Sequence, residues 1–124
     1  MNKILIDFEI NSLDSKVKFR TLGKYNNQKI TFKDKELNSH KIILNKEIVE
    51  YYKTGSMDMK FVFDLKNSTI GTYLVDENLF KFDISTTRLE NSNNKLLIEY
   101  SLIQNNEIVN KSTLIILYSI TQEE

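Results

Sequence analysis

Apolar and polar residues alternate with a period of two along most of this chain. From residue 57 to residue 65, every odd position is apolar and every even position is polar except Val62. The same period recurs in six further segments, at residues 4–10, 16–20, 29–33, 80–84, 95–102 and 114–120. Because successive side chains of a β-strand point to opposite faces, each of these segments predicts a strand with one buried face.

Short clusters rich in asparagine, aspartate, serine and glycine separate these strands. They lie at residues 11–15, 26–28, 45–46, 54–56, 66–68, 76–78, 91–94 and 105–106. Asparagine tolerates positive φ, so such clusters can form the tight turns of β-hairpins. Residues 46–52 follow neither period cleanly, and they predict a strand covered on both faces or a bulge, with a helical turn as the alternative. The whole pattern predicts about eight to ten short antiparallel strands in a meander.

An antiparallel meander must pair or hide its two edge strands. The first and last predicted strands are both strongly apolar, which favours pairing between them and closure of the sheet into a barrel. Composition agrees, because the chain contains no alanine or proline and is rich in β-branched and aromatic residues. The 124 residues suit one domain over residues 1–124. We therefore expect an all-β fold, closed into a barrel.

Charge and cysteine content exclude several classes of function. Basic and acidic residues number 17 each, so the net charge is zero, which argues against non-specific nucleic-acid binding but leaves a local basic patch open. A small stacking site for single-stranded nucleic acid at Arg20, Lys24, Tyr25 and Lys29 is the minor alternative. The absence of cysteine excludes disulfides and cysteine-ligated zinc. No apolar run approaches the roughly 20 residues of a membrane-spanning helix, and no secretory signal is apparent, so we expect a cytoplasmic protein without membrane contact.

Candidate catalytic residues are few. The only histidine, His40, precedes a strand, and we interpret it as a solvated residue at the strand start, with a general base or metal ligand as the alternative. Carboxylates are scattered, and the three glycines form no phosphate-binding loop. We expect no cofactor, no metal and no enzymatic activity; a hydrolase using His40 with a nearby carboxylate is the alternative.

Apolar residues on the buried faces either fill the barrel or line a ligand cavity within it. The candidate lining residues are Phe19, Tyr25, Phe32, Met59, Phe61, Phe82 and Tyr100. The only arginines, Arg20 and Arg88, are candidates for anion binding, since guanidinium binds carboxylate or phosphate with two hydrogen bonds; a solvated role on a strand face is the alternative. A stripe on the predicted solvent faces favours a homodimer as a further possibility. It consists of Leu5, Leu97, Ile103, Ile115 and Leu117.

Several segments, taken in order, resemble the YwiB-like family of small bacterial proteins. They are Phe19-Arg-Thr-Leu-Gly-Lys-Tyr25 with Ile30-Thr-Phe32, then Gly55-Ser-Met-Asp-Met59, Gly71-Thr-Tyr73, Phe80-Lys-Phe-Asp-Ile-Ser-Thr86 with Leu89-Glu90, and Leu96-Leu-Ile-Glu-Tyr-Ser-Leu102. The chain departs from the family at Val75-Asp-Glu-Asn78, where a Thr-Pro-Tyr-Gly turn is common. The resemblance implies a calycin-like, lipocalin-type β-barrel over roughly residues 3–118. It implies no activity, because a fold does not dictate a function.

Taken together, the residues and the resemblance favour a non-catalytic binding module. The expected partner is a small apolar ligand held in the barrel mouth, or a protein that docks on its rim. A structural role as a homodimer is the alternative.

Overall fold

The computed structural model describes residues 2–123, and these residues form ten strands and no helix. The strands are β1 (Asn2–Ser12), β2 (Lys16–Asn26), β3 (Lys29–Lys33), β4 (Ser39–Asn45), β5 (Ile48–Thr54), β6 (Asp58–Asp64), β7 (Thr69–Val75), β8 (Asn78–Ser92), β9 (Lys95–Gln104) and β10 (Glu107–Glu123). The predicted all-β meander is confirmed. The helical alternative for residues 46–52 is wrong, because residues 48–54 pair on both sides as β5.

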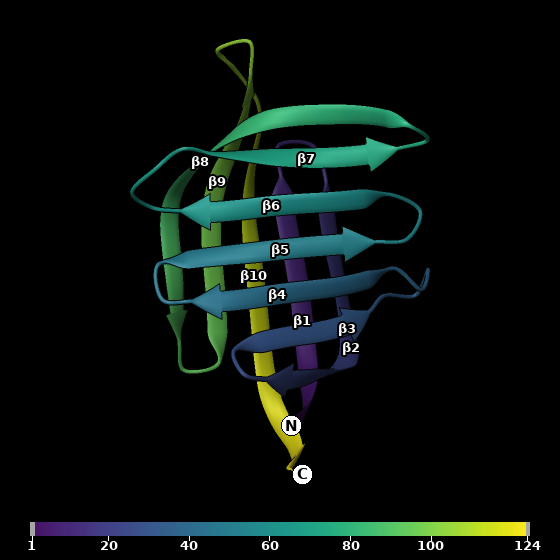
Figure 1. Ribbon diagram of the computed structural model, residues 1–124. Helices are drawn as coiled ribbons and strands as arrows, with labels where there is room; N and C mark the ends of the chain where they lie inside the picture. Colours follow the sequence, from purple (N-terminus) through teal and green to yellow (C-terminus); the bar gives the residue numbers. More distant parts are fainter. Residues whose placement is uncertain (1, 124) are drawn as a thin grey trace.

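Pairing between the first and last strands closes the sheet. β1 lies between β10 and β2, and the hydrogen-bonded order runs β1-β10-β9-β8-β7-β6-β5-β4-β3-β2 without an open edge. The strands form two layers that cross at a large angle (Figure 1): β3 to β7 lie across β1, β2, β9 and β10. The long strand β8 belongs to both layers, since it pairs with β7 at one end and with β9 at the other. A β-bulge between Thr86 and Arg88 lies in its second half, and such bulges bend a strand.

Four hairpins turn through two residues that both have positive φ. These turns are Asn27-Gln28, Asp76-Glu77, Asn93-Asn94 and Asn105-Asn106. Two positive φ angles are typical of the type I′ turn, whose twist matches that of the flanking strands. The predicted turn clusters are confirmed at all four places, and asparagine or aspartate begins each turn in place of the usual glycine or asparagine-glycine pair.

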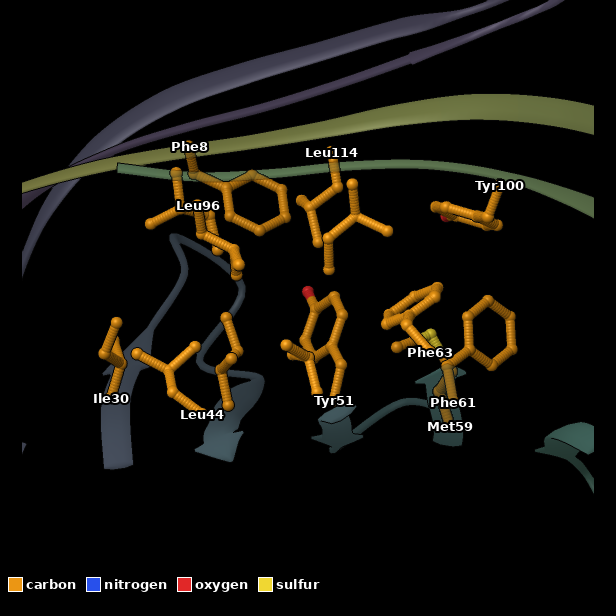
Figure 2. Packing of buried hydrophobic residues seen from close by; sticks show 14 of the residues in the cluster. Phe8, Ile30, Leu44, Tyr51, Met59, Phe61, Phe63, Leu96, Tyr100 and Leu114 are labelled. Carbon is orange, nitrogen blue, oxygen red and sulfur yellow. The ribbon is translucent and has the colours of Figure 1, made fainter. Parts of the chain in front are cut away.

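Aliphatic side chains from both layers meet inside the barrel, as Figure 2 shows for part of the core. Ten of them have no exposed surface: Ile4, Ile6, Ile30, Ile42, Val49, Ile84, Leu96, Ile98, Leu114 and Ile116. Aromatic residues gather farther along the same interior, where Phe61, Phe63 and Tyr100 pack edge to face or tilted. This core carries most of the hydrophobic stabilisation of the barrel.

The predicted solvent-facing stripe is not uniformly exposed. Leu97 is 8% exposed, so its assignment to solvent is wrong. Its cross-strand neighbours are Ile115 on β10 and Glu90 on β8. Leu117 remains 44% exposed. The homodimer stays a prediction.

Replacing Gly55 with alanine is expected to lower the free energy of unfolding by about 1–3 kcal/mol. Gly55 has a φ of 150°, and an added Cβ would lie 2.0 Å from Oδ1 of Asn38. Asn38 is 2% exposed and cannot move aside freely. Urea denaturation measures the change. Ser56→Ala, which keeps the backbone N–H that binds Asn38, is the control, and equal stability of both variants would contradict the clash.

Candidate functional site

A cavity of about 450 Å³ opens at one end of the barrel. Its walls come from the end of β1, the start of β2, β9 and β10 on one side, and from β4 to β7 with the β3–β4 loop on the other. The β1–β2 turn of this rim lies at the opposite end of β1 from the two chain termini (Figure 1). Ligand sites in proteins have comparable volumes, so this mouth is large enough for a small molecule.

Four of the seven predicted lining residues line this cavity: Phe19, Met59, Phe61 and Tyr100. The rings of Phe19 and Phe8 stack with centroids 4.7 Å apart and form one apolar wall. Phe61 and Tyr100 meet edge to face at 6.1 Å on another. Aromatic rings therefore form two parts of the cavity wall. Its role in ligand binding stays a prediction.

The other three predicted lining residues lie elsewhere. Phe32 stacks on the His40 ring at 4.5 Å and supports the wall from behind. Tyr25 stacks on Tyr118 at 5.8 Å, outside the lining of the mouth. Phe82 packs edge to face on Tyr73 at 5.8 Å. Tyr73 lines the cavity, whereas Phe82 does not. All three share the inward face of their strands, but they lie at other depths along the barrel.

A buried chain of hydrogen bonds joins Asp34, His40 and Tyr51 beside the cavity. His40 Nε2 lies 3.0 Å from Asp34 Oδ2, and His40 Nδ1 lies 2.7 Å from Tyr51 Oη. The His40 side chain is only 4% exposed, so its interpretation as a solvated residue is wrong. The reason is its register, because His40 shares the inward face of β4 with Ile42 and Leu44. We call Asp34, His40 and Tyr51 the Asp–His–Tyr chain.

Electrostatics fix the protonation states of this chain. Burial alone would raise the pKa of Asp34, but hydrogen bonds from His40, Asn38 and the backbone N–H of Glu36 outweigh it and lower the pKa to about 2. Burial lowers the pKa of His40, although Asp34 opposes this shift. At neutral pH His40 is therefore uncharged, with Nε2–H donating to Asp34 and Nδ1 accepting from the Tyr51 hydroxyl.

Tyr51 presents its hydroxyl to the interior. The residue is 4% exposed, and burial raises its pKa well above the ordinary value for tyrosine. Figure 2 shows its oxygen pointing across the barrel toward the layer that carries Leu114. Because its proton goes to His40, its oxygen keeps lone pairs that can accept a hydrogen bond from a ligand.

Asp34 and Asn38 also fix the β3–β4 loop at the rim. Asp34 Oδ1 accepts the backbone N–H groups of Glu36 at 2.9 Å and Asn38 at 3.0 Å. Asn38 Oδ1 in turn accepts the backbone N–H of Ser56 at 3.0 Å, which ties the loop to the β5–β6 turn. The loop places Lys35 and Glu36 at the cavity. The rim beside the Asp–His–Tyr chain is therefore held by hydrogen bonds on both sides.

The opposite wall carries a second group of polar side chains. The hydroxyls of Ser12 and Ser112 lie 2.9 Å apart. Asn110 follows a register shift between β9 and β10, and its Oδ1 is buried without a hydrogen bond from residues 2–123. Buried acceptors without a partner are uncommon in native proteins. Among the residues that the structure describes, this oxygen is therefore an acceptor without a donor, and it belongs to a residue of the cavity wall.

The two arginines lie on the outside of the barrel, away from the cavity. Arg20 Nε lies 2.7 Å from Asp7 Oδ1. Arg88 forms ion pairs with Glu90 and, at 3.7 Å, with Glu99. Both guanidinium groups thus already form ion pairs with carboxylates of the protein. Anion binding by these residues stays a prediction.

Residues 2–123 contain neither a cluster of metal ligands nor a membrane-spanning helix. In the part of the chain that the structure describes, no three His, Cys, Asp or Glu side chains gather where they could hold a metal ion. The same part contains no helix long and apolar enough to cross a bilayer.

Sequence reasoning missed three members of this site: Asp34, Tyr51 and Asn110. Asp34 lies in a loop, Tyr51 lies in the segment whose period is ambiguous, and Asn110 follows a bulge. One signal was present for His40, since it stands two residues before Ile42 and four before Leu44 on the same alternating face.

The fold and the cavity define a class of protein: a closed, antiparallel β-barrel with an open mouth at one end. A family model described as Domain of unknown function (DUF1934) matches residues 5–116. The chain belongs to this family.

Comparison with solved structures supports the same conclusion. The crystal structure of the ywiB protein from Bacillus subtilis aligns with a TM-score of 0.75 at 16% identity, covering 98% of this chain and 93% of that one. This likeness confirms the YwiB-like, calycin-like barrel. No curated protein matches the chain.

Proposed function

We propose that this protein is a non-catalytic cytoplasmic module that binds a small, largely apolar molecule in the mouth of its barrel. The observation that carries the proposal is the cavity of about 450 Å³, which adjoins the filled core and has an aromatic lining. Apolar pockets with a few convergent polar groups are the usual form of small-molecule sites.

The walls indicate the chemistry of the ligand. Its apolar body would contact Phe8, Phe19, Met59 and Phe61. Its polar end would carry a hydrogen-bond donor, such as a hydroxyl or an amide, because the buried oxygen of Asn110 lacks a donor among the described residues. The Tyr51 oxygen can accept a second bond.

The Asp–His–Tyr chain supports binding over catalysis. Among the described residues, the one hydroxyl bonded to His40 belongs to Tyr51, and burial raises the pKa of Tyr51, which leaves it protonated and a weak nucleophile. Both ring nitrogens of His40 are engaged, with Asp34 and with Tyr51. A hydrolase based on His40 would therefore lack an activated nucleophile in this arrangement.

Met59→Trp is expected to weaken binding by at least about tenfold, since the larger ring would fill part of a cavity that Met59 lines. The probe is an anilinonaphthalene sulfonate dye, followed by fluorescence titration. Ile70→Trp adds the same ring at an exposed position on β7, where it lines neither the cavity nor the groove over β2 to β5, and is the control.

Native mass spectrometry of protein purified from cells provides the second test of this proposal. We expect a mass above that of the bare chain, with the excess reduced in Met59→Trp and retained in Ile70→Trp. A bare mass together with equal dye binding by both variants would contradict the proposal.

A further inference from the structure

The lining of a groove on the outer surface of the barrel contains lysine side chains and no carboxylate. The groove has a volume of about 750 Å³ and lies over β2 to β5. Its ammonium groups belong to Lys24, Lys33 and Lys41, and no carboxylate residue lines it. Hydroxyl groups complete the polar surface and come from Thr21, Thr31, Ser39, Tyr52 and Thr54. Leu22, Gly23, Phe32 and His40 complete the lining, so the groove presents positive charge and hydrogen-bonding groups to an anion beside apolar side chains.

The strand register extends this surface into a straight row. The successive cross-strand pairs are Lys24–Thr31, Thr31–Lys41, Lys41–Tyr52, Tyr52–Lys60, Lys60–Thr72 and Thr72–Lys81. We call these seven residues the basic row. Adjacent strands lie about 4.8 Å apart, so six steps span roughly 29 Å. The row begins on β2, crosses β3 to β7, which lie side by side in one layer (Figure 1), and ends on β8.

Tyr52 lies in the middle of the basic row with a cation on each side. Lys41 Nζ is 4.8 Å from the centre of its ring and Lys60 Nζ is 5.8 Å from it. The Tyr52 hydroxyl donates to Glu50 Oε1 at 2.6 Å, which fixes the ring. Both ammonium groups lie over the ring, so a base that stacks on it takes the place of one of them, and that lysine can then bind a neighbouring phosphate.

The lysines of the basic row are not neutralised by the protein. Within residues 2–123, Lys24, Lys41, Lys60 and Lys81 form no ion pair. The arginines of the barrel, by contrast, are all paired with carboxylates. Placing four unpaired cations in one line leaves an excess of positive charge along it, even though the whole chain is neutral.

We propose that the groove and the basic row bind single-stranded nucleic acid. Phosphates would contact the lysines and the threonine hydroxyls, while one base stacks on Tyr52. A row one residue wide on a convex barrel wall fits a linear polyanion better than a flat lipid surface. Because only the phosphate charges of the nucleic acid and base stacking contribute, binding is expected to be independent of the nucleotide sequence. The expected Kd is about 1–100 µM at low salt.

The test is fluorescence anisotropy with a labelled 15-nucleotide oligothymidylate at about 50 mM salt. Each phosphate contact contributes a slope of about −0.7 in log K against log salt, so Lys41→Gln/Lys60→Gln is expected to weaken binding roughly 10- to 60-fold and to flatten the slope by about 1.4. Lys95→Gln/Lys111→Gln removes the same charge from exposed positions on β9 and β10 and is the matched control. Equal loss in both variants, or no binding to the unmodified protein, would overturn the proposal.

The Tyr52→Leu variant distinguishes the binding of nucleic acid from the binding of other polyanions. Loss of base stacking is expected to weaken oligothymidylate binding about 5- to 100-fold while leaving inorganic polyphosphate binding within about twofold. If Tyr52→Leu binds the oligonucleotide as tightly as the unmodified protein, the row acts only as a site for charge, and nucleic acid is not its ligand. Circular dichroism of each variant confirms that the barrel is intact.

Discussion

Phe63→Ala is expected to lower the free energy of unfolding by about 3–5 kcal/mol. Phe63 has no exposed surface, and its ring packs against Tyr100 at 4.7 Å and Phe61 at 6.1 Å. It lies on β6 in one layer, whereas Tyr100 lies on β9 in the other, so the substitution removes a contact that joins the two layers. Domains of this size typically have 5–15 kcal/mol of stability, so the loss would be a large fraction of the total.

Guanidinium chloride denaturation followed by circular dichroism measures this loss. Phe80→Ala is the control, because Phe80 is 48% exposed near the free end of the β7–β8 hairpin and is expected to lose less than about 1.5 kcal/mol. An unchanged m-value in both variants would show that the transition still reports the same unfolding. If the two variants lost equal stability, the contact between the two layers at Phe63 would not contribute the stability that we expect from its burial.

Most of the fold could be predicted from the sequence because its determinants are local. Whether a side chain points inward follows from its parity along a strand, and the turns follow from residues that tolerate positive φ, such as Asn93 and Asn94. Closure followed from two apolar terminal strands that needed partners. Side-chain direction and turns depend on neighbours in sequence, whereas closure joins the two ends of the chain but needs only the apolar pattern of β1 and β10.

The site could be predicted only in part, because alternation gives direction but not depth. Phe61 and Phe82 both point inward, yet only Phe61 reaches the cavity. Depth depends on the tilt and stagger of all ten strands, which no single segment encodes. The Asp–His–Tyr chain was missed for another reason, since it joins a loop carboxylate to two strands and becomes visible only when they pack.

The Asp–His–Tyr chain is also expected to make the largest polar contribution to the stability of the barrel. His40→Leu is expected to lower the free energy of unfolding by about 2–4 kcal/mol, because it leaves the buried Tyr51 hydroxyl without its partner and removes one of the two hydrogen bonds to Asp34 Oδ2. His40→Gln offers an amide donor toward Asp34 and should lose clearly less. Equal losses in the two variants would indicate that packing against Phe32, rather than hydrogen bonding, accounts for the effect.

The dependence of stability on pH tests the same chain and completes this prediction. The pKa of His40 is lowered in the folded state, so the unfolded chain binds a proton first, and stability is expected to fall as the pH drops below about 6.5. Asp34 adds a second loss between about pH 4 and its folded pKa of about 2, since its folded carboxylate resists protonation. His40→Gln does not titrate, so it should keep the second loss and lack the first. If the stability of His40→Gln and that of the unmodified protein changed equally between pH 7 and pH 5, His40 would not be the group whose protonation lowers stability in this range.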